Sequence, residues 1–247
     1  MIDLHSHVLP GLDDGAADLD EALAICRAAA EDGIEVLAAT PQVRDDYPTT
    51  AEQMEQALAA VRAAAGDSVR LVGGGEIDLA RLDLPRAELA RFALAGNPKY
   101  LLVETPYGGW PLDLPEKLFR LLAEGITPVL AHPERNGEVQ QRPELLEPIV
   151  AGGTLVQLTA ASIDGRMGRR ARSCAATLLE RNLAHLLASD AHAPSVRAIG
   201  MGAAVASIGD EALARWLTAE VPGAILENDP VPPRPRTARP RRRFFGR

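Results

Sequence analysis

The stretch Thr127-Pro-Val-Leu-Ala-His132 is a short apolar run that ends in a histidine, and this pattern decides the fold. Apolar runs of about four to eight residues predict buried β-strands. The pattern recurs along the chain and predicts strands over residues 2–5, 35–40, 69–73, 100–104, 127–132, 154–158 and 185–189. Helical periodicity between and after these runs predicts helices near residues 19–32, 51–65, 85–94, 113–124, 143–151, 167–182, 197–207 and 210–219.

Regular alternation of nearly continuous apolar strands with helices predicts parallel strands that are covered by helices. Polar residues follow directly after the apolar part of five strands: His5, Thr40, Glu104, His132 and Asp190. A closed barrel collects its functional groups at the carboxyl ends of its strands, whereas an open sheet uses only one crevice. The chain has neither G-x-G-x-x-G nor G-x-x-x-x-G-K-[ST], so no nucleotide loop supports an open sheet. We therefore predict an α/β fold, a distorted seven-stranded (β/α)7 barrel.

Composition excludes several classes of protein. With 47% hydrophobic and 24% charged residues, the chain resembles an ordinary globular protein, and no apolar run approaches the roughly 20 residues of a membrane span. The start, Met-Ile-Asp-Leu-His, has no secretion signal, which predicts a cytoplasmic protein. The net charge is −8, and it becomes −14 when residues 228–247 are left out. Such an acidic body is a poor surface for nucleic acid.

Residues 228–247 differ in composition from the rest of the chain. They contain seven arginines, five prolines and one acid, a composition that cannot form a buried core. We predict one domain over residues 1–227 and a disordered basic tail over residues 228–247. The tail is either a solubilising end or a segment that an anionic partner or lipid surface attracts.

The two cysteines, Cys26 and Cys174, lie in Ala-rich helical patterns, which argues against a disulfide framework and thiolate metal sites. A cysteine-dependent phosphatase needs an arginine six positions after its cysteine, but Arg181 lies seven after Cys174, in a helical run. No G-x-S-x-G elbow is present either. Cysteine and serine nucleophiles are therefore excluded.

Four of the five histidines have a spacing that suits a metal ion. His5 and His7 are two residues apart, so in a strand both side chains point to the same side. Asp190 and His192 form a similar pair near the end of the last strand. A lone H-x-H is weak support for a metal, and the turn Asp13-Asp14-Gly15 is equally consistent with a simple turn or helix cap.

Carboxylates at the ends of apolar strands strengthen the prediction of a metal centre. Glu76 follows a strand and three glycines, and Glu104 ends Tyr-Leu-Leu-Val-Glu. A buried carboxylate is costly unless a cation compensates it, and two or three divalent ions would do so. Imidazole and carboxylate ligands without sulfur favour manganese, iron or zinc over magnesium or calcium.

These motifs together resemble the PHP (polymerase and histidinol phosphatase) superfamily, and within it the bacterial metal-dependent tyrosine-protein phosphatases of capsular and exopolysaccharide clusters. The resemblance extends from Met1 to about residue 227 and implies a PHP-type distorted barrel with a trinuclear metal site. It implies that Glu104 bridges two ions and that Arg135 and Arg197 bind phosphate. The metal ligands that it implies are His5, His7, Asp14, Glu76, Glu104, His132, Asp190 and His192.

Two residues depart from the pattern of this family. Gln42 stands where the family usually has a histidine, and a carboxamide is a weaker ligand than imidazole for manganese, iron or zinc. We therefore expect a weaker third ion. Thr159 stands where the family commonly has asparagine, so part of the pocket rim is expected to differ.

The resemblance implies hydrolysis of phosphotyrosine by a metal-bound hydroxide, without a covalent intermediate. It implies a substrate protein, a tyrosine kinase of polysaccharide synthesis, at the inner membrane surface. The basic tail lies outside the resemblance, and its charge would attract the phosphatase to that surface. One alternative is another PHP phosphoesterase, of the histidinol-phosphate type. The other is a weakly catalytic, metal-bound regulator of polysaccharide assembly.

Overall fold

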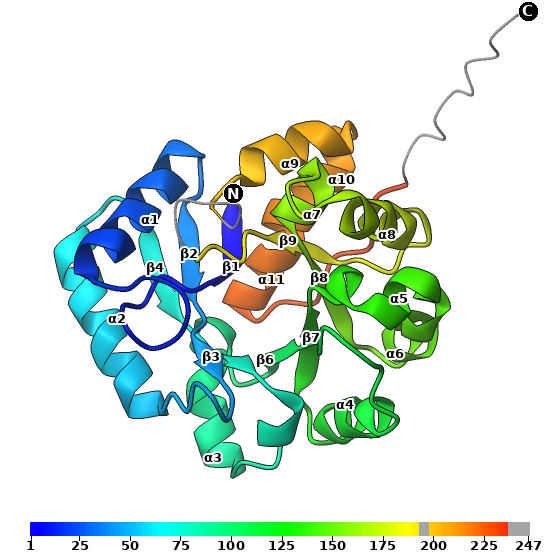
Figure 1. The fold of residues 1–247 in the computed structure, drawn as a ribbon, viewed down its shortest axis with the longest axis horizontal. Helices are drawn as coiled ribbons and strands as arrows, with labels where there is room; N and C mark the ends of the chain where they lie inside the picture. Colours follow the sequence, from blue (N-terminus) through cyan, green and yellow to red (C-terminus); the bar gives the residue numbers. More distant parts are fainter. Residues whose placement is uncertain (193–197, 237–247) are drawn as a thin grey trace, which may run out of the picture.

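The computed structural model describes residues 1–192 and 198–236, and these residues form an α/β fold with parallel strands inside a ring of helices (Figure 1). One sheet contains three strands in the order β1 (Ile2–Ser6), β2 (Val36–Ala39) and β4 (Arg70–Gly73). The other contains six, in the order β3 (Gln42–Val43), β5 (Glu76–Ile77), β6 (Tyr100–Glu104), β7 (Thr127–Ala131), β8 (Leu155–Thr159) and β9 (Leu186–Ala188). The predicted α/β class is therefore confirmed.

The distortion of the barrel comes from breaks in its second and third strands. Pro41 lies between β2 and β3, and because proline has no N–H group it cannot continue the ladder. Gly74 and Gly75 lie between β4 and β5, where a Cβ atom on Gly75 would stand 2.7 Å from the ring of Phe92. The chain therefore passes from one sheet into the other at both places.

The first and last strands lie side by side. The N–H of Asp190 donates to the carbonyl of His5 at 2.9 Å, and the N–H of His7 donates to the carbonyl of Ala191 at 2.8 Å. With these contacts the strands follow one another in barrel order, although they are hydrogen-bonded as two sheets. This order places the carboxyl ends of all the strands at one end of the fold.

The helices cover the outside of the strands. Asp18 caps the first helix through the N–H of Glu21, and Thr50 and Gln53 form a capping box at the start of the second. The α-helices of the described chain are α1 (Leu19–Glu31), α2 (Ala51–Ala65), α3 (Arg86–Leu89), α4 (Leu114–Ala123), α5 (Gly137–Gln141), α6 (Glu147–Ala151), α7 (Ala160–Asp164), α8 (Arg169–Glu180), α9 (Met201–Ile208), α10 (Glu211–Arg215) and α11 (Val221–Glu227).

Three of these helices were not predicted. The five residues of α5 and of α7 are too few to show a helical period, which needs about two turns. The helix predicted over 210–219 continues through a π-helical turn (Trp216–Glu220) into α11, where Pro222 occupies an early position that needs no N–H donor.

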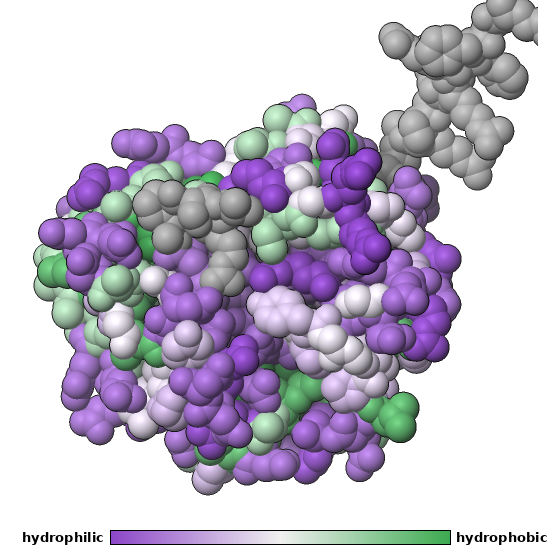
Figure 2. Space-filling view, viewed as in Figure 1, coloured by the Kyte–Doolittle hydropathy of each residue, from purple (hydrophilic) through white to green (hydrophobic). Residues whose placement is uncertain are grey.

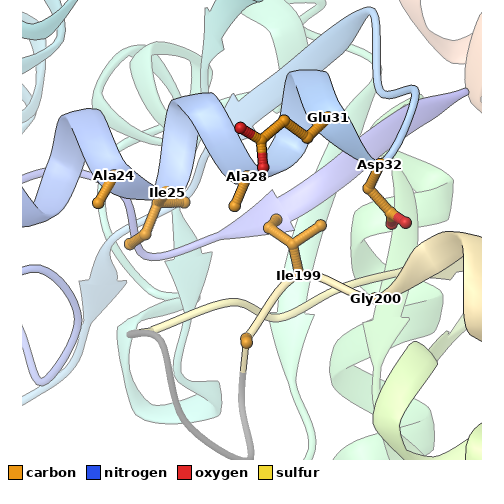
Figure 3. A pocket seen from close by; sticks show the side chains of 8 residues that line it. Ala24, Ile25, Ala28, Glu31, Asp32, Ile199 and Gly200 are labelled. Carbon is orange, nitrogen blue, oxygen red and sulfur yellow. The ribbon is translucent and has the colours of Figure 1, made fainter.

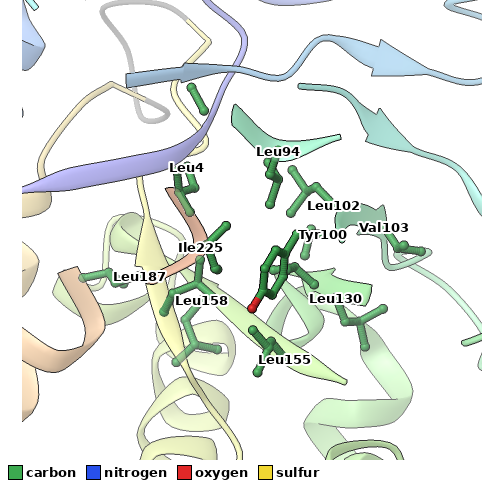
Figure 4. Close-up of a cluster of buried hydrophobic side chains, with 14 of the residues drawn as sticks. Leu4, Leu94, Tyr100, Leu102, Val103, Leu130, Leu155, Leu158, Leu187 and Ile225 are labelled. Carbon is green, nitrogen blue, oxygen red and sulfur yellow. The ribbon is translucent and has the colours of Figure 1, made fainter. Parts of the chain in front are cut away.

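The apolar core lies between the strands, beneath their polar carboxyl ends. Figure 4 shows a cluster of buried apolar side chains that different strands contribute, with several leucines among them. These leucines are at most 1% exposed, and each stabilises the fold by about 1.5–3 kcal/mol relative to an exposed side chain. They are Leu4, Leu102, Leu130, Leu158 and Leu187.

The first part of the predicted basic tail differs from the expectation. The indole N–H of Trp216 donates to the carbonyl of Pro232 at 3.0 Å. The guanidinium of Arg234 donates to the carbonyls of Leu179 and Ala184, both at 2.9 Å, and lies over the ring of Trp216. These contacts show that residues 228–236 lie against the domain formed by residues 1–227. The prolines favour this placement, because they lower the entropy that the segment loses when it becomes ordered. The remaining tail, residues 237–247, lies outside the described residues.

Within residues 1–192 and 198–236, no helix has both the length and the apolar character that crossing a membrane requires.

Candidate metal centre

Four of the predicted ligands meet at the carboxyl ends of their strands. The Nε2 atom of His5 lies 3.6 Å from Oε2 of Glu76 and 3.4 Å from Oδ1 of Asp190. The Nε2 atom of His132 lies 2.7 Å from Oε1 of Glu76. These four side chains come from β1, β5 and the residues after β7 and β9, and each is at most 2% exposed. The fold therefore buries two imidazoles and two carboxylates together.

His7 joins this cluster from the residue after β1. Its Nε2 atom lies 3.2 Å from Nε2 of His5 and 3.3 Å from Oδ1 of Asp190, as the two-residue spacing predicts. Two imidazole nitrogens that face the same carboxylate form an arrangement suited to a shared cation.

The donor atoms of the described residues fall into three groups that could each hold a metal ion, with all atoms of a group within 4.8 Å of one another. His5 and His7 each belong to two groups, so the three groups overlap in one continuous centre. The groups are His5, His7 and Asp190; His5, Glu76 and His132; and His7, Asp14 and His192.

The charges of the cluster are strongly coupled. Burial alone would raise the pKa of Glu76, but His5 and His132 outweigh it and hold that pKa well below its usual value. Burial likewise opposes the ionised form of Asp190, whose pKa is nevertheless lowered well below normal, mainly by His5 and His7. Both carboxylates are therefore ionised and need positive charge beside them.

The donor set fits divalent metal ions. Nδ1 of His132 and Oε1 of Gln42 are buried, and neither has a hydrogen-bond partner within the described chain. A buried polar atom without a partner is unfavourable unless a ligand completes its environment. Nitrogen and oxygen donors of this kind suit first-row divalent ions.

Two of the cluster residues have a strained backbone. His132 has φ 37° and ψ 46°, and Asp190 has φ 52°, so both are in the left-handed region that few residues other than glycine adopt. The N–H of His132 is held by the carbonyl of Gln157 at 2.9 Å. Such strain persists where the surrounding structure holds a functional group in place.

Residues that orient the imidazoles were missed by the sequence analysis. A carboxylate oxygen of Asp13 lies 2.7 Å from Nδ1 of His7 and also accepts from the N–H of Gln42 at 2.9 Å. Oε1 of Gln157 lies 3.0 Å from Nδ1 of His5. These contacts leave the Nε2 atoms directed into the cluster. A glutamine inside the otherwise apolar run of β8 was the signal that could have revealed Gln157.

The outer group contains the residue that departs from the family pattern. Nε2 of His192 lies 3.2 Å from Oδ1 of Asp14, and the side-chain amide of Gln42 donates to the same oxygen at 3.2 Å. Asp14 has a side chain that is 40% exposed, so this group lies nearer to solvent than the other two. Gln42 therefore lies beside the third group, where the family histidine was expected.

Glu104 does not belong to any of the three groups in the described residues, although it was expected to bridge two ions. Its carboxylate instead accepts from Nη1 of Arg44 at 3.1 Å. Burial and the nearby Glu76 raise the pKa of Glu104 to about 7. The guanidinium supplies the positive charge that this buried carboxyl needs, and the sequence analysis did not identify Arg44.

Arg135 reaches the cluster from the turn that follows β7. Its Nη1 donates to Oδ2 of Asp190, and its Nη2 donates to the hydroxyl of Tyr107 at 2.9 Å. The guanidinium also lies over the Tyr107 ring, 4.8 Å from its centroid. Arg197, the other expected phosphate-binding arginine, lies outside the described residues.

Thr159 is 1% exposed, so it does not form part of an open rim. Its N–H donates to Oε1 of Glu134 at 3.0 Å, and burial raises the pKa of this glutamate. Thr159 therefore belongs to the buried support behind the turn that carries Arg135.

Two cysteines and a separate hollow lie outside this cluster. Burial raises the pKa of the Cys26 thiol to about 11 and that of Cys174 to about 12, so neither is a ready nucleophile. A separate hollow of about 350 Å³ lies between α1 and residues 198–200 (Figure 3). Its carboxylate at Asp32 already accepts from the N–H of Gly202 at 3.0 Å.

Comparison with known proteins shows which family the chain resembles. The family model for capsular polysaccharide synthesis, CpsB/CapC, matches residues 1–227. The tyrosine-protein phosphatase YwqE of Bacillus subtilis is 33% identical over 199 residues, which cover 78% of this chain and 77% of that protein. The tyrosine-protein phosphatase CpsB of Streptococcus agalactiae is 28% identical over 210 residues, which cover 80% of this chain and 85% of that protein.

Comparison with solved structures gives the same relatives. The chain is similar to a structure reported for YwqE of Bacillus subtilis and CpsB of Streptococcus pneumoniae, which are called unique metal-dependent tyrosine phosphatases. The TM-score is 0.84 at 30% identity, and the match covers 96% of this chain and all of the other. A hydrolase of Acinetobacter baumannii at 16% identity and a TM-score of 0.53 shares the fold alone. From the match over residues 1–227 and the identity to these relatives, the chain belongs to the CpsB/CapC family of capsular polysaccharide synthesis.

Proposed function

We propose that this protein is a metal-dependent protein-tyrosine phosphatase that hydrolyses phosphotyrosine on a protein substrate. The observation that carries the proposal is the buried set of imidazoles and carboxylates with Arg135 beside it. A phosphoryl group carries negative charge that metal ions and a guanidinium balance together. The relatives named as tyrosine-protein phosphatases support the same activity.

Residues of the chain perform distinct parts of this reaction. His5, His7 and Asp190 would hold one ion, and His5, Glu76 and His132 would hold a second beside it. When bound, such ions activate water and neutralise charge on the phosphoryl oxygens. Arg135 would bind the phosphoryl oxygens with its forked donors, and we assign the same role to Arg197.

We propose two firmly bound ions and a weaker third one. The third would contact Asp14, His192 and Gln42, whose carboxamide is a poorer ligand than imidazole. Glu104 accepts a hydrogen bond from Arg44, and the remaining lone pairs of its carboxylate would be available to bind an ion beside that contact. The imidazole-rich donor set favours manganese, with iron and zinc as the other suitable metals.

The natural substrate would be a tyrosine kinase of capsular or exopolysaccharide synthesis, since the family takes part in that process. We propose a cytoplasmic protein that works next to the inner membrane surface. Residues 228–247 contain six arginines besides Arg234, which packs on the body, and these six would attract the protein to anionic lipid or to an acidic partner.

Turnover with manganese tests this function. The protein should hydrolyse p-nitrophenyl phosphate and a phosphotyrosine peptide, and it should prefer the peptide over histidinol phosphate. A preference for histidinol phosphate would assign the chain to the other PHP phosphoesterases. Bound metal without any turnover would instead identify a regulator.

A further inference from the structure

Tyr107 lies at the open side of the candidate site. Side-chain exposure rises from 2% at Asp190 to 9% at Arg135, and Tyr107 is 46% exposed. These three residues are joined in this order by hydrogen bonds. Tyr107 therefore lies where the buried cluster opens to solvent. Figure 2 shows that the surface on this view of the molecule is mostly hydrophilic.

The structure fixes the position of Tyr107 relative to Arg135. The side-chain amide of Asn136, the residue after Arg135, donates to the carbonyl of Pro106 at 2.5 Å and to that of Gly109 at 2.7 Å. The N–H of Gly137 donates to the carbonyl of Tyr107 itself at 3.2 Å. The loop that carries Tyr107 and the turn that carries Arg135 are therefore held as one unit.

The ring of Tyr107 is also held. It is parallel to the imidazole of His132, with an interplanar angle of 4° and 5.9 Å between ring centroids. On the guanidinium side, Nη2 of Arg135 donates to the hydroxyl oxygen. Because the hydroxyl accepts this hydrogen bond, its own hydrogen is available for donation to another oxygen.

The direction of the reaction indicates which oxygen that is. In-line attack places the leaving group opposite the attacking water. The substrate protein must lie outside the buried cluster, so the leaving oxygen faces the open side, where Tyr107 stands. The phosphoryl group would be held by Arg135, whose guanidinium contacts the Tyr107 hydroxyl directly.

We propose that Tyr107 is a further catalytic residue, whose hydroxyl donates a hydrogen bond to the leaving phenol oxygen of phosphotyrosine. This inference rests on the proposed phosphatase function. As the oxygen of the attacking water bonds to phosphorus and this water releases a proton to solvent, the bond between phosphorus and the phenol oxygen breaks. Its electron pair stays on the phenol oxygen, and the hydrogen bond from Tyr107 stabilises the new negative charge. Tyr107 keeps its proton, and the released phenolate takes a proton from water.

The test is Tyr107→Phe in the full-length, manganese-loaded protein, because phenylalanine keeps the ring and removes only the hydroxyl. We expect kcat/KM for phenyl phosphate and for a phosphotyrosine peptide to fall about 10- to 100-fold, the range for a hydrogen bond to a charged group. Turnover of p-nitrophenyl phosphate should change less than about threefold, since its nitro group already disperses the charge of the leaving oxygen.

Two controls accompany this variant. Tyr100→Phe makes the same chemical change at the amino end of β6, in the core, and should leave all three activities unchanged. Inhibition by inorganic phosphate should be equal in Tyr107→Phe and the unaltered protein, because Arg135 stays bound to Asp190.

An equal fall on all three substrates, or weaker inhibition by phosphate, would reduce Tyr107 to a support for Arg135 and overturn the proposal. An unchanged rate on the phosphotyrosine peptide would overturn it too. If the unaltered protein hydrolyses none of the substrates, the proposed function itself fails, and that result is distinct from any effect of the substitution.

Discussion

The apolar part of the barrel strands and their carboxyl ends differ in the partners that their side chains have. In β6, Leu101, Leu102 and Val103 pack among other apolar side chains, whereas Glu104, one residue further, needs Arg44. In the apolar part, contacts between side chains of the chain itself bury these three residues. The carboxyl end buries ionised carboxylates and imidazoles, and some of its polar atoms have no partner in the described residues. Stability therefore resides mainly at one end and chemistry at the other, and substitutions at the two ends should have different effects.

The largest effect is expected at the carboxyl end. Asp190→Asn preserves the size of the side chain and tolerates the positive φ, but it removes the charge that faces His5, His7 and Arg135. We expect kcat/KM to fall by about 10³-fold or more, because metal ions contribute several kcal/mol to catalysis. Bound metal should also fall, while circular dichroism shows a folded chain. Wild-type turnover with full metal content would contradict the assignment.

A substitution in the apolar part of the same barrel should have the opposite profile. Leu102→Ala creates a cavity in the core and should lower the free energy of unfolding by about 2–5 kcal/mol. Urea denaturation measures this loss. Below the unfolding transition, metal content and kcat/KM should stay within about threefold of the unaltered protein. If activity falls as sharply as in Asp190→Asn, the apolar part of the strands contributes to catalysis as well as to stability, which would contradict the comparison.

A smaller effect is expected for a residue that orients a ligand. Asp13→Asn weakens the contact with Nδ1 of His7 and should lower metal affinity or activity about 10- to 100-fold, the range for such outer partners. Metal titration followed by activity measures both. Asp67→Asn, at an exposed carboxylate after α2, is the matched control and should change neither. Equal affinities in the two variants would remove Asp13 from the site.

The smallest effect concerns His185, the one histidine at the amino end of its strand. Burial, together with Arg234, lowers its pKa to about 4, and Nδ1 accepts from the N–H of Val156. Between pH 6.5 and pH 4 the unfolded chain binds more protons than the folded one, so stability is full above pH 6.5 and is lost as pH falls. We expect a loss of at most about 2 kcal/mol between pH 7 and pH 5.

His185→Gln should make this part of the pH dependence disappear. Urea denaturation of both proteins at pH 7 and pH 5 gives the difference that His185 alone causes. An identical pH dependence in the two proteins would show that the ring is not protonated selectively in the unfolded chain.

The two ends also differ in how well the sequence predicts them. Apolar runs define the strands because burial demands apolar residues over several positions, so all seven predicted strands have a counterpart in the fold. The two-residue strands β3 and β5 are too short to show an apolar pattern. The breaks beside Pro41 and Gly75 are visible only in the way the strands hydrogen-bond into two sheets.

At the site, position along a strand predicted which residues gather, because parallel strands bring their carboxyl ends together. Partners from loops were not predictable in this way. Arg44 and Tyr107 follow no periodic pattern, and their contacts with Glu104 and Arg135 depend on how distant segments pack. Asp13 was noticed only as part of a turn, since its contact with His7 requires the bend between them.

The central claim is that the carboxyl end of the barrel needs divalent metal ions for phosphotyrosine hydrolysis. The direct measurement is to strip the protein with a chelator, confirm its metal content, and titrate manganese while following turnover of a phosphotyrosine peptide. We predict that turnover is lost on stripping and returns in proportion to bound manganese, saturating at about two ions for each chain. Full turnover of the metal-free protein, or no recovery while manganese binds, would contradict the claim.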